Sequence, residues 1–250
     1  VDYVLADGTL TFNPRTSTSA GDRERQIVVT LLRDNLNEDN EQVVIRLTGF
    51  TNAVSNGADI ATLIITDSSA PPTVRLVGAE QRIAERAGSA AFTVELNQVS
   101  ALPVAVPYTV AGTASAGGTA PGANDHNLRG GVVMIPAGTT SARVRFTIFD
   151  DQVDEGDETI IIRLDTPFNA DLVSPTEHIV TIEDDDTAKV NLSGQSFTLD
   201  EGESTAYSVR LNSQPTANVT VRLEPDAQLH TSPRELSFTP LNWSQPQTVT

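Results

Sequence analysis

Acidic side chains of this chain gather in four short segments between positions 85 and 186. Glu85 and Asp125 stand in two of them, and the other two are the run 150–158, DDQVDEGDE, and the triplet 184–186, DDD. Carboxylates held close together without a cation repel one another, whereas Ca2+ takes about 6–8 oxygen ligands at about 2.3–2.6 Å and tolerates irregular loops. The residue types therefore predict a calcium site, provided that the fold brings the four segments to one place.

The overall charge limits the classes of partner. The chain has 33 acidic and 16 basic residues and a net charge of −17. Its field repels phosphate backbones and anionic lipid headgroups, so neither nucleic acid nor a membrane surface is expected as a partner. An acidic run by itself usually marks a solvated surface turn. Here four separated segments can supply one site, and this agreement favours metal binding.

Other site chemistries find little support. The absence of cysteine excludes thiolate metal sites, a catalytic Cys and disulfides. His126, His178 and His230 are not at metal-ligand spacing, and no G-x-S-x-G, P-loop or dinucleotide motif occurs. Paired acids such as Asp157 and Glu158 suggest glycosidase chemistry, but the acids are too numerous and aromatic residues make up only 5%. We expect no enzyme activity.

The acidic run belongs to an internal repeat. Segment 32–47 reads LRDNLNEDNEQVVIRL and segment 149–164 reads FDDQVDEGDETIIIRL. A further repeat matches segment 82–96, RIAERAGSAAFTVEL, with segment 198–211, TLDEGESTAYSVRL. The chain thus holds three copies, of which only the middle one is whole. We expect domains at 1–71, 72–187 and 188–250, the first and last being parts of a domain.

Apolar residues recur at every second position, which predicts half-buried strands. The clearest series are Val144, Phe146 and Ile148; Ile160, Ile162 and Leu164; Ile27, Val29 and Leu31; and Tyr207, Val209 and Leu211. About seven short strands in each copy indicate an all-β, immunoglobulin-like sandwich, with a closed barrel as the alternative. The joints at 69–72 and 186–188 are too short for flexible linkers, so the domains are expected to lie end to end as a stiff rod.

A strand ending in Asp-Asp, an acidic turn of the type DExxE and a domain closing in Asp-Asp-Asp resemble the Calx-β family. That family is known from the regulatory domains of sodium–calcium exchangers and from large bacterial surface proteins. The resemblance extends over essentially the whole chain and implies Ca2+ as the bound ion. It also implies the following ligands or near-ligands in the middle copy: Glu85, Asp125, Asp150, Asp151, Glu155, Glu158, Asp184, Asp185 and Asp186.

The outer copies depart from this pattern. In the first, Arg33 stands where the middle copy has Asp150, and TDSS at 66–69 replaces EDDD at 183–186. A guanidinium there can take the place of one ion, so one weak site or none is expected. The third copy stops before its Asp-Asp turn. The weaker candidates in these copies are Asp2, Asp34, Glu38, Glu41, Asp67 and Glu201.

These observations favour a calcium-binding, non-catalytic stalk segment of a large bacterial adhesin, filament or matrix-type surface protein. We expect no apolar membrane span and no signal peptide in this stretch, which reads as a fragment of an extracellular chain. Its partners would be neighbouring repeats, other surface proteins or copies of itself. A calcium-sensing regulatory domain pair of a membrane protein is the first alternative. A protein- or glycan-binding module using the loop 112–127 is the second.

Overall fold

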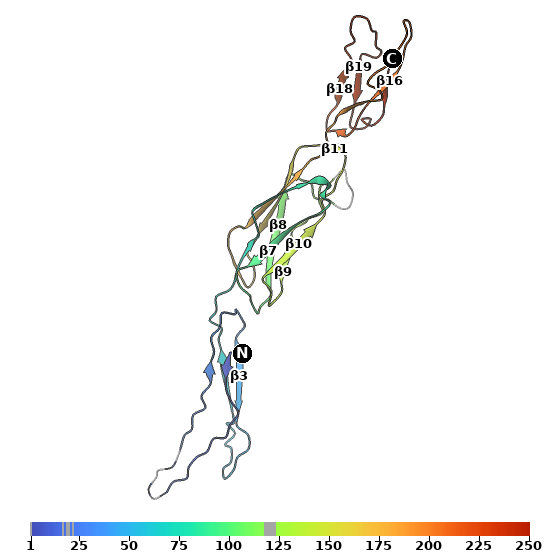
Figure 1. Cartoon of the computed structure of the whole chain (residues 1–250). Helices are drawn as coiled ribbons and strands as arrows, with labels where there is room; N and C mark the ends of the chain where they lie inside the picture. Colours follow the sequence, from blue (N-terminus) through green and yellow to red (C-terminus); the bar gives the residue numbers. More distant parts are fainter. Residues whose placement is uncertain (1, 17, 19–20, 22, 118–123) are drawn as a thin grey trace.

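The computed structural model describes residues 2–16, 18, 21, 23–117 and 124–250. Three β-rich parts follow one another along a long axis (Figure 1). Strands and one 3-10 turn, η1 (Glu85–Ala87), are the regular elements of the described residues. The predicted all-β class with domains end to end is therefore confirmed. None of the described residues form a helix long and apolar enough to cross a membrane.

The middle part is a sandwich of two sheets. One sheet has the order β10-β7-β5-β13 and the other the order β6-β14-β12-β8-β9, so the closed barrel is wrong. The first sheet consists of β10 (Ser141–Phe146), β7 (Ala90–Leu96), β5 (Thr73–Leu76) and β13 (Asp171–Leu172). The second consists of β6 (Glu80–Ala84), β14 (Glu177–Glu183), β12 (Glu158–Leu164), β8 (Val104–Gly112) and β9 (Gly131–Ile135).

The middle sandwich has nine strands in its two sheets, more than the expected seven or so. Part of the excess arises because its first strand is split. The chain leaves β5, turns at Gly78, whose φ is 77°, and continues as β6 in the opposite sheet. Glycine adopts this left-handed conformation without the steric cost that a Cβ brings. Because of this crossing, the N-terminal segment of the middle domain supplies one strand to each sheet.

Alternation of buried and exposed side chains builds the core between the sheets. Residues of β7 and β14 are fully buried at every second position, as the period of two predicts. The largest buried side chains include Leu76, Ile135, Ile160 and Ile162. Few aromatics are needed, because two sheets about 10 Å apart are filled by branched aliphatic side chains.

The first part of the chain contains β1 (Tyr3–Val4), β2 (Thr30–Leu31), β3 (Glu41–Arg46) and β4 (Ile60–Ile65). The strand predicted from Ile27 to Leu31 is wrong in extent, because only its last two residues pair, with β1. Ile27 is 40% exposed and Val28 71% exposed. Alternation predicts a strand only where a neighbouring strand and a core cover one face, and here the described residues provide neither for 27–29.

The third part contains β15 (Val190–Leu192), β16 (Tyr207–Leu211), β17 (Gln214–Pro215), β18 (Val219–Arg222), β19 (Glu235–Phe238) and β20 (Gln247–Val249). Its small core holds Val209, Leu211, Leu236, Phe238 and Val249, with Trp243 packed against it. The alternation predicted from Tyr207 to Leu211 is confirmed by β16.

A test of the middle sandwich is offered by Gly112, the last residue of β8. Its φ is 132°, and a Cβ built there would lie 2.0 Å from the carbonyl oxygen of Thr159. Gly112→Ala should therefore lower the free energy of unfolding by about 1–3 kcal/mol, measured by denaturant titration of the full chain. Gly131→Ala is the matched control, because its Cβ would meet Tyr108 at an ordinary 3.4 Å. Equal stability of the two variants would contradict this account.

Candidate metal centre

Strand direction brings the acidic segments to one pole of the middle sandwich. β6 and β14 run parallel, and their register pairs Ala84 with Glu183 at the last position of each strand. The next residues, Glu85 and Asp184, therefore leave the sheet side by side. Glu85 lies in the turn η1, where Gly88 takes the left-handed conformation that ends the turn.

The other two segments reach the same pole because β12 runs antiparallel to both of its neighbours, β14 and β8. β12 begins where β14 ends, so the acidic run that precedes Glu158 lies at this pole. β8 ends opposite the start of β12, and the loop after it returns through Asp125. The Phe149 N–H donates to the Asp125 carbonyl oxygen at 2.9 Å, and the Ser115 N–H donates to Asp125 Oδ2 at 2.5 Å. These bonds fix Asp125 beside the acidic run.

Three groups of carboxylate oxygens result, with the atoms of each group within 4.8 Å of one another. They are Glu85 with Asp184 and Asp186, Glu85 with Asp150 and Asp185, and Asp125 with Glu155 and Glu158. Two oxygens on opposite sides of a Ca2+ ion lie roughly 5 Å apart, twice the usual ligand distance. An ion of this size therefore fits each group. One small cavity is lined by Glu85, Asp125, Glu155, Glu158 and Asp184, so acids of the first and third groups border the same space.

Asp151, the remaining candidate of the middle copy, has a second task. Its N–H donates to Glu85 Oε1 at 3.2 Å, and its own Oδ1 accepts from the Val153 N–H at 2.7 Å. Asp151 thus holds the acidic turn in shape and lies against Glu85. The structure brings all nine candidates of the middle copy to this pole, and their role as ligands stays a prediction.

Burial and mutual repulsion disfavour the charged forms of these carboxyls. Glu85 is only 6% exposed. Loss of hydration and the nearby Asp151 raise its pKa to about 8. Burial, together with the hydrogen bond that protonated Glu158 donates to Asp125, raises the pKa of Glu158 to about 7. Burial also raises the pKa values of Glu155, Asp184 and Asp186. The pole therefore favours a bound proton or a bound cation.

Two arginines at the pole were missed by sequence reasoning. Arg86 Nη1 lies 2.6 Å from Asp185 Oδ2. Arg82 Nε lies 2.6 Å from Glu183 Oε1, and its Nη2 lies 2.8 Å from Asp157 Oδ2. These ion pairs are exposed, and they neutralise Asp157, Glu183 and Asp185. No arginine is paired with the buried Glu85 among the ion pairs of the described residues. The one sequence signal was the basic pair flanking Glu85.

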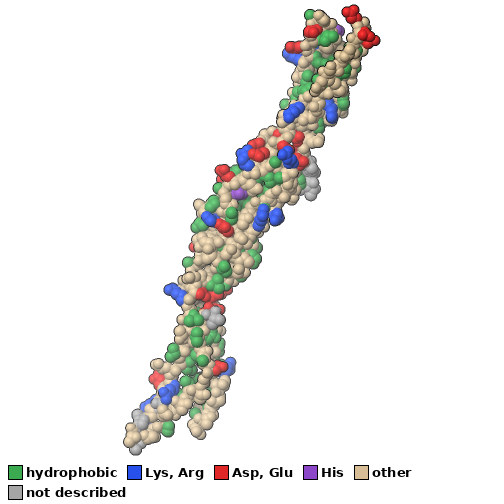
Figure 2. All heavy atoms as spheres, viewed as in Figure 1, with side chains coloured by type: hydrophobic (Ala, Val, Ile, Leu, Met, Phe, Trp, Pro, Cys, Tyr) green, Lys and Arg blue, Asp and Glu red, His purple; other side chains and the backbone are tan. Residues whose placement is uncertain are grey.

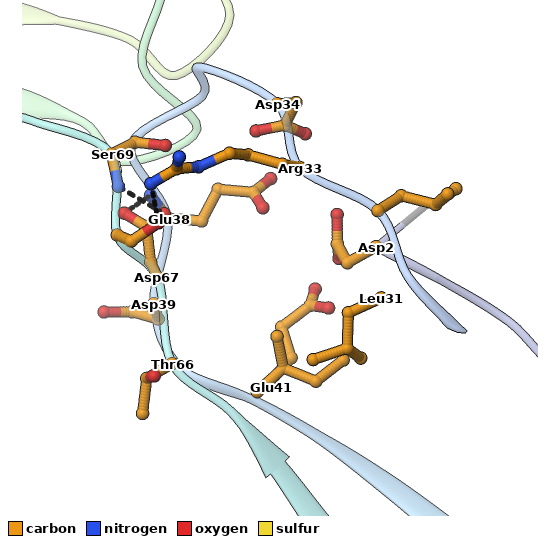
Figure 3. Close-up of a pocket in the computed structure, with 13 residues that line it drawn as sticks. Asp2, Leu31, Arg33, Asp34, Glu38, Asp39, Glu41, Thr66, Asp67 and Ser69 are labelled. Carbon is orange, nitrogen blue, oxygen red and sulfur yellow. Dashed lines mark hydrogen bonds between the residues drawn. The ribbon is translucent and has the colours of Figure 1, made fainter. Parts of the chain in front are cut away.

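The first part of the chain holds a looser version of the site (Figure 3). Oxygens of Asp2, Glu38 and Glu41 lie within 4.8 Å of one another. Asp34, Asp67 and Arg33 line the same hollow, in company with Asp39. Arg33 Nη2 donates to Ser68 Oγ at 3.2 Å, so the guanidinium lies toward the Asp67 side of the hollow, away from Asp2 and Glu41.

Asp67 and its counterpart Asp184 both accept main-chain hydrogen bonds, but the pKa of Asp67 is lowered whereas burial raises that of Asp184. The Ser69 and Glu38 N–H groups donate to its two oxygens at 3.0 and 3.3 Å. These main-chain donors, the Ser69 amide foremost, lower the pKa of Asp67. Burial and the neighbouring acids raise the pKa of Glu38, and the contact with Asp2 raises that of Glu41. Asp67 is therefore already compensated, and the remaining acids offer at most one site here.

The candidate in the third copy stands alone. Glu201 lies exposed in a turn and belongs to none of the acidic groups found among the described residues. Part of the loop proposed for a protein or glycan partner, 118–123, lies outside the described residues. Ala116 and His126 of that loop are joined by a β-bridge. Because His126 directly follows Asp125, this end of the loop lies at the acidic pole.

The model of the Calx-beta domain matches residues 1–69 and 67–186. This chain belongs to the Calx-β family. Calx-β domains bind Ca2+, and the acidic groups of the chain have the all-oxygen donor chemistry that Ca2+ requires.

Solved structures of Calx-β domains are similar to this chain. The apo form of the Calx CBD1 domain is 26% identical over 47% of this chain and 100% of its own, with a TM-score of 0.41. CBD12 from CALX1.2 is 25% identical over 71% of this chain and 73% of its own, also with a TM-score of 0.41. The Calx CBD2 domain is 14% identical over 45% of this chain and 86% of its own, with a TM-score of 0.38. No curated protein matches.

Calcium binding at this pole should depend on pH. Protons and Ca2+ compete for Glu85 and Glu158, whose pKa values are about 8 and about 7. Calcium affinity should therefore fall as the pH is lowered from about 9 to about 6, and binding near neutral pH should release protons. Titration calorimetry in buffers of different ionisation enthalpy measures both effects. An affinity that is the same at both pH values would contradict the raised pKa values.

Without calcium the linkage has the opposite sign. A carboxyl whose pKa is raised in the folded state stabilises that state at low pH, and this contribution is lost as pH rises from its usual value of 4.5 to about 8. Glu85→Gln should therefore raise the calcium-free melting temperature most at about pH 9, less at about pH 6, and little at about pH 4. The same variant should reduce the stabilisation that calcium gives. Glu80→Gln, an exposed acid at the start of β6, is the charge-matched control.

Proposed function

We propose that this chain is a non-catalytic, calcium-binding stalk segment of a large extracellular or cell-surface repeat protein of the adhesin, filament or matrix type. The observation that carries the proposal is the position of the acidic pole. It lies where the middle domain meets the third, since the triplet Asp184 to Asp186 runs directly into β15. Ions bound there act at a joint and leave the open faces of the sandwich untouched.

The physical action of the ion is to remove a cost of folding. At the pole eight carboxylates lie in three groups, two of which share the buried Glu85. Ca2+ binds these groups only when the fold has assembled them, so it stabilises the folded state by mass action. At the millimolar calcium level found outside cells, weak sites suffice. Figure 2 shows acidic side chains gathered at both joints of an elongated chain.

A calcium-sensing domain pair of a membrane protein is the second candidate. One observation favours it: the acidic turn itself contacts the next domain, because β11 (Val153–Asp154) pairs with β17. An ion bound at this turn would therefore act on the contact between the two domains. A sensor requires dissociation constants near cytosolic calcium, at about 10⁻⁷–10⁻⁵ M, whereas a stalk requires only weaker sites. Affinity therefore separates the two.

The decisive experiment is calcium titration of the full chain by calorimetry, followed by thermal unfolding with calcium and with chelator. We expect calcium to raise the first unfolding transition. Asp125→Asn combined with Glu158→Gln should abolish most of this shift, because it removes two charges from one group. Asp165→Asn combined with Glu80→Gln removes two exposed charges elsewhere and should leave the shift intact. An unfolding transition that ignores calcium would refute the proposed function.

A further inference from the structure

The joint between the middle and third domains is built from main-chain hydrogen bonds. β11, the two-residue strand inside the acidic turn, pairs in parallel with β17 of the third domain, with Val153 opposite Gln214 and Asp154 opposite Pro215. The Gln214 N–H donates to the Gln152 carbonyl oxygen at 2.6 Å. Figure 1 places β11 at this joint. The acidic turn thus contributes a strand to its neighbour.

The joint between the first and middle domains uses the same device. Asn37 and Ser100 form a parallel β-bridge, and the Ala101 N–H donates to the Asn37 carbonyl oxygen at 3.1 Å. Ser100 Oγ adds a bond to the same oxygen at 3.4 Å. Asn37 and Ser100 are 8% and 1% exposed, so the contact is buried.

The two joints match position by position. The repeat that pairs Asp34 with Asp151 and Glu38 with Glu155 also places Asn37 at the position of Asp154. Ser100 and Pro215 each follow a Leu-Asn pair at the same spacing. Both joints therefore bridge equivalent residues in the same parallel sense, although the residues themselves differ.

Both partners of the bridge are also held in place in the same way. In the acidic turns, Asp34 Oδ1 accepts from the Leu36 N–H at 2.9 Å, as Asp151 Oδ1 does from Val153. In the receiving loops, Asn97 Oδ1 accepts from the Thr73 N–H at 2.7 Å, and Asn212 Oδ1 accepts from the Lys189 N–H at 2.5 Å. An aspartate thus shapes each turn, and an asparagine braces each receiving loop against the first strand of its own domain.

We infer that the acidic turn of each domain is the docking strand for the domain that follows, and that this parallel bridge sets the angle between successive domains. The partner that the turn fits is a loop of the next domain, the one after β7 in the middle domain and after β16 in the third. Because the contact uses main-chain groups, it tolerates the change from Ser100 to Pro215 while keeping its register. Every joint built this way repeats the same rotation along the chain.

This inference deepens the proposed stalk function, and its test separates the two. Gln214→Pro removes the N–H that donates to Gln152, and Ala101→Pro removes the one that donates to Asn37. The matched control is Val99→Pro, the position in the first joint that is equivalent to Gln214; the Val99 N–H forms no hydrogen bond in the described part of the chain. Spin-label pairs across each joint report the spread of interdomain distances.

The expected result is joint-specific. Gln214→Pro should broaden the distance distribution across the second joint alone, Ala101→Pro should broaden that across the first joint alone, and the control Val99→Pro should broaden neither. In the unaltered chain, hydrogen exchange should show the Gln214 and Ala101 amides protected about tenfold or more relative to that of Val99. This second measurement needs no variant and stands even if a proline disturbs its loop.

Calcium calorimetry on the same variants keeps the two claims apart. If the Gln214→Pro chain binds calcium as the unaltered chain does while its joint loosens, both the inference and the calcium site are supported. If the distributions stay narrow and the two amides exchange freely, the docking bridge is refuted, whatever the calcium result. Loss of calcium response in the unaltered chain, with narrow joints, would refute the stalk function and leave the bridge standing.

Discussion

The parallel pairing of β6 with β14 is the constraint on which the acidic pole depends. In an antiparallel arrangement Glu85 and Asp184 would leave the sheet at opposite ends. The parallel register of Ala84 with Glu183 instead makes the first and last strands of the domain finish together. The chain therefore enters the domain at one end and leaves it at the other, and its final acids meet Glu85 at the joint.

A cost follows from that convergence. Assembling many carboxylates around a nearly buried Glu85 is unfavourable unless a proton or a cation compensates their charge. Arg82 and Arg86 compensate only the exposed acids. The first domain reduces the same cost with an arginine in place of one acid, whereas the main-chain amides that donate to Asp67 have counterparts on Asp184. The two poles thus differ in how much they require an ion.

Sequence patterns predicted the class of fold from a local rule, the alternation of apolar residues. The grouping of the acids was predicted from the repeat and from the resemblance to the Calx-β family. Alternation identified β10, β12 and β16, and the repeat located the acidic run of each copy. Alternation failed at Ile27, where no neighbouring strand covers the segment. The split of the first strand at Gly78 depends on which sheet each half joins, and no periodicity encodes that choice.

The contacts that sequence reasoning missed are long-range and lack a residue pattern. The bridge from Asp154 to Pro215 uses backbone groups, which every sequence possesses, so only the assembled domains reveal it. The ion pair of Arg86 with Asp185 joins segments far apart in the chain, and an exposed arginine has many such acids to choose from. In both cases proximity created by the fold, and no motif, decides the partner.

The parallel neighbours β6 and β14 also decide how the domain responds to tension. A pull on the two ends of the chain slides these strands past each other along their length, because the load enters near the start of one and leaves at the end of the other. All hydrogen bonds between them then bear the load together, instead of opening one after another. A domain wired in this way resists extension by shear, and the two interdomain bridges lie on the same line of force.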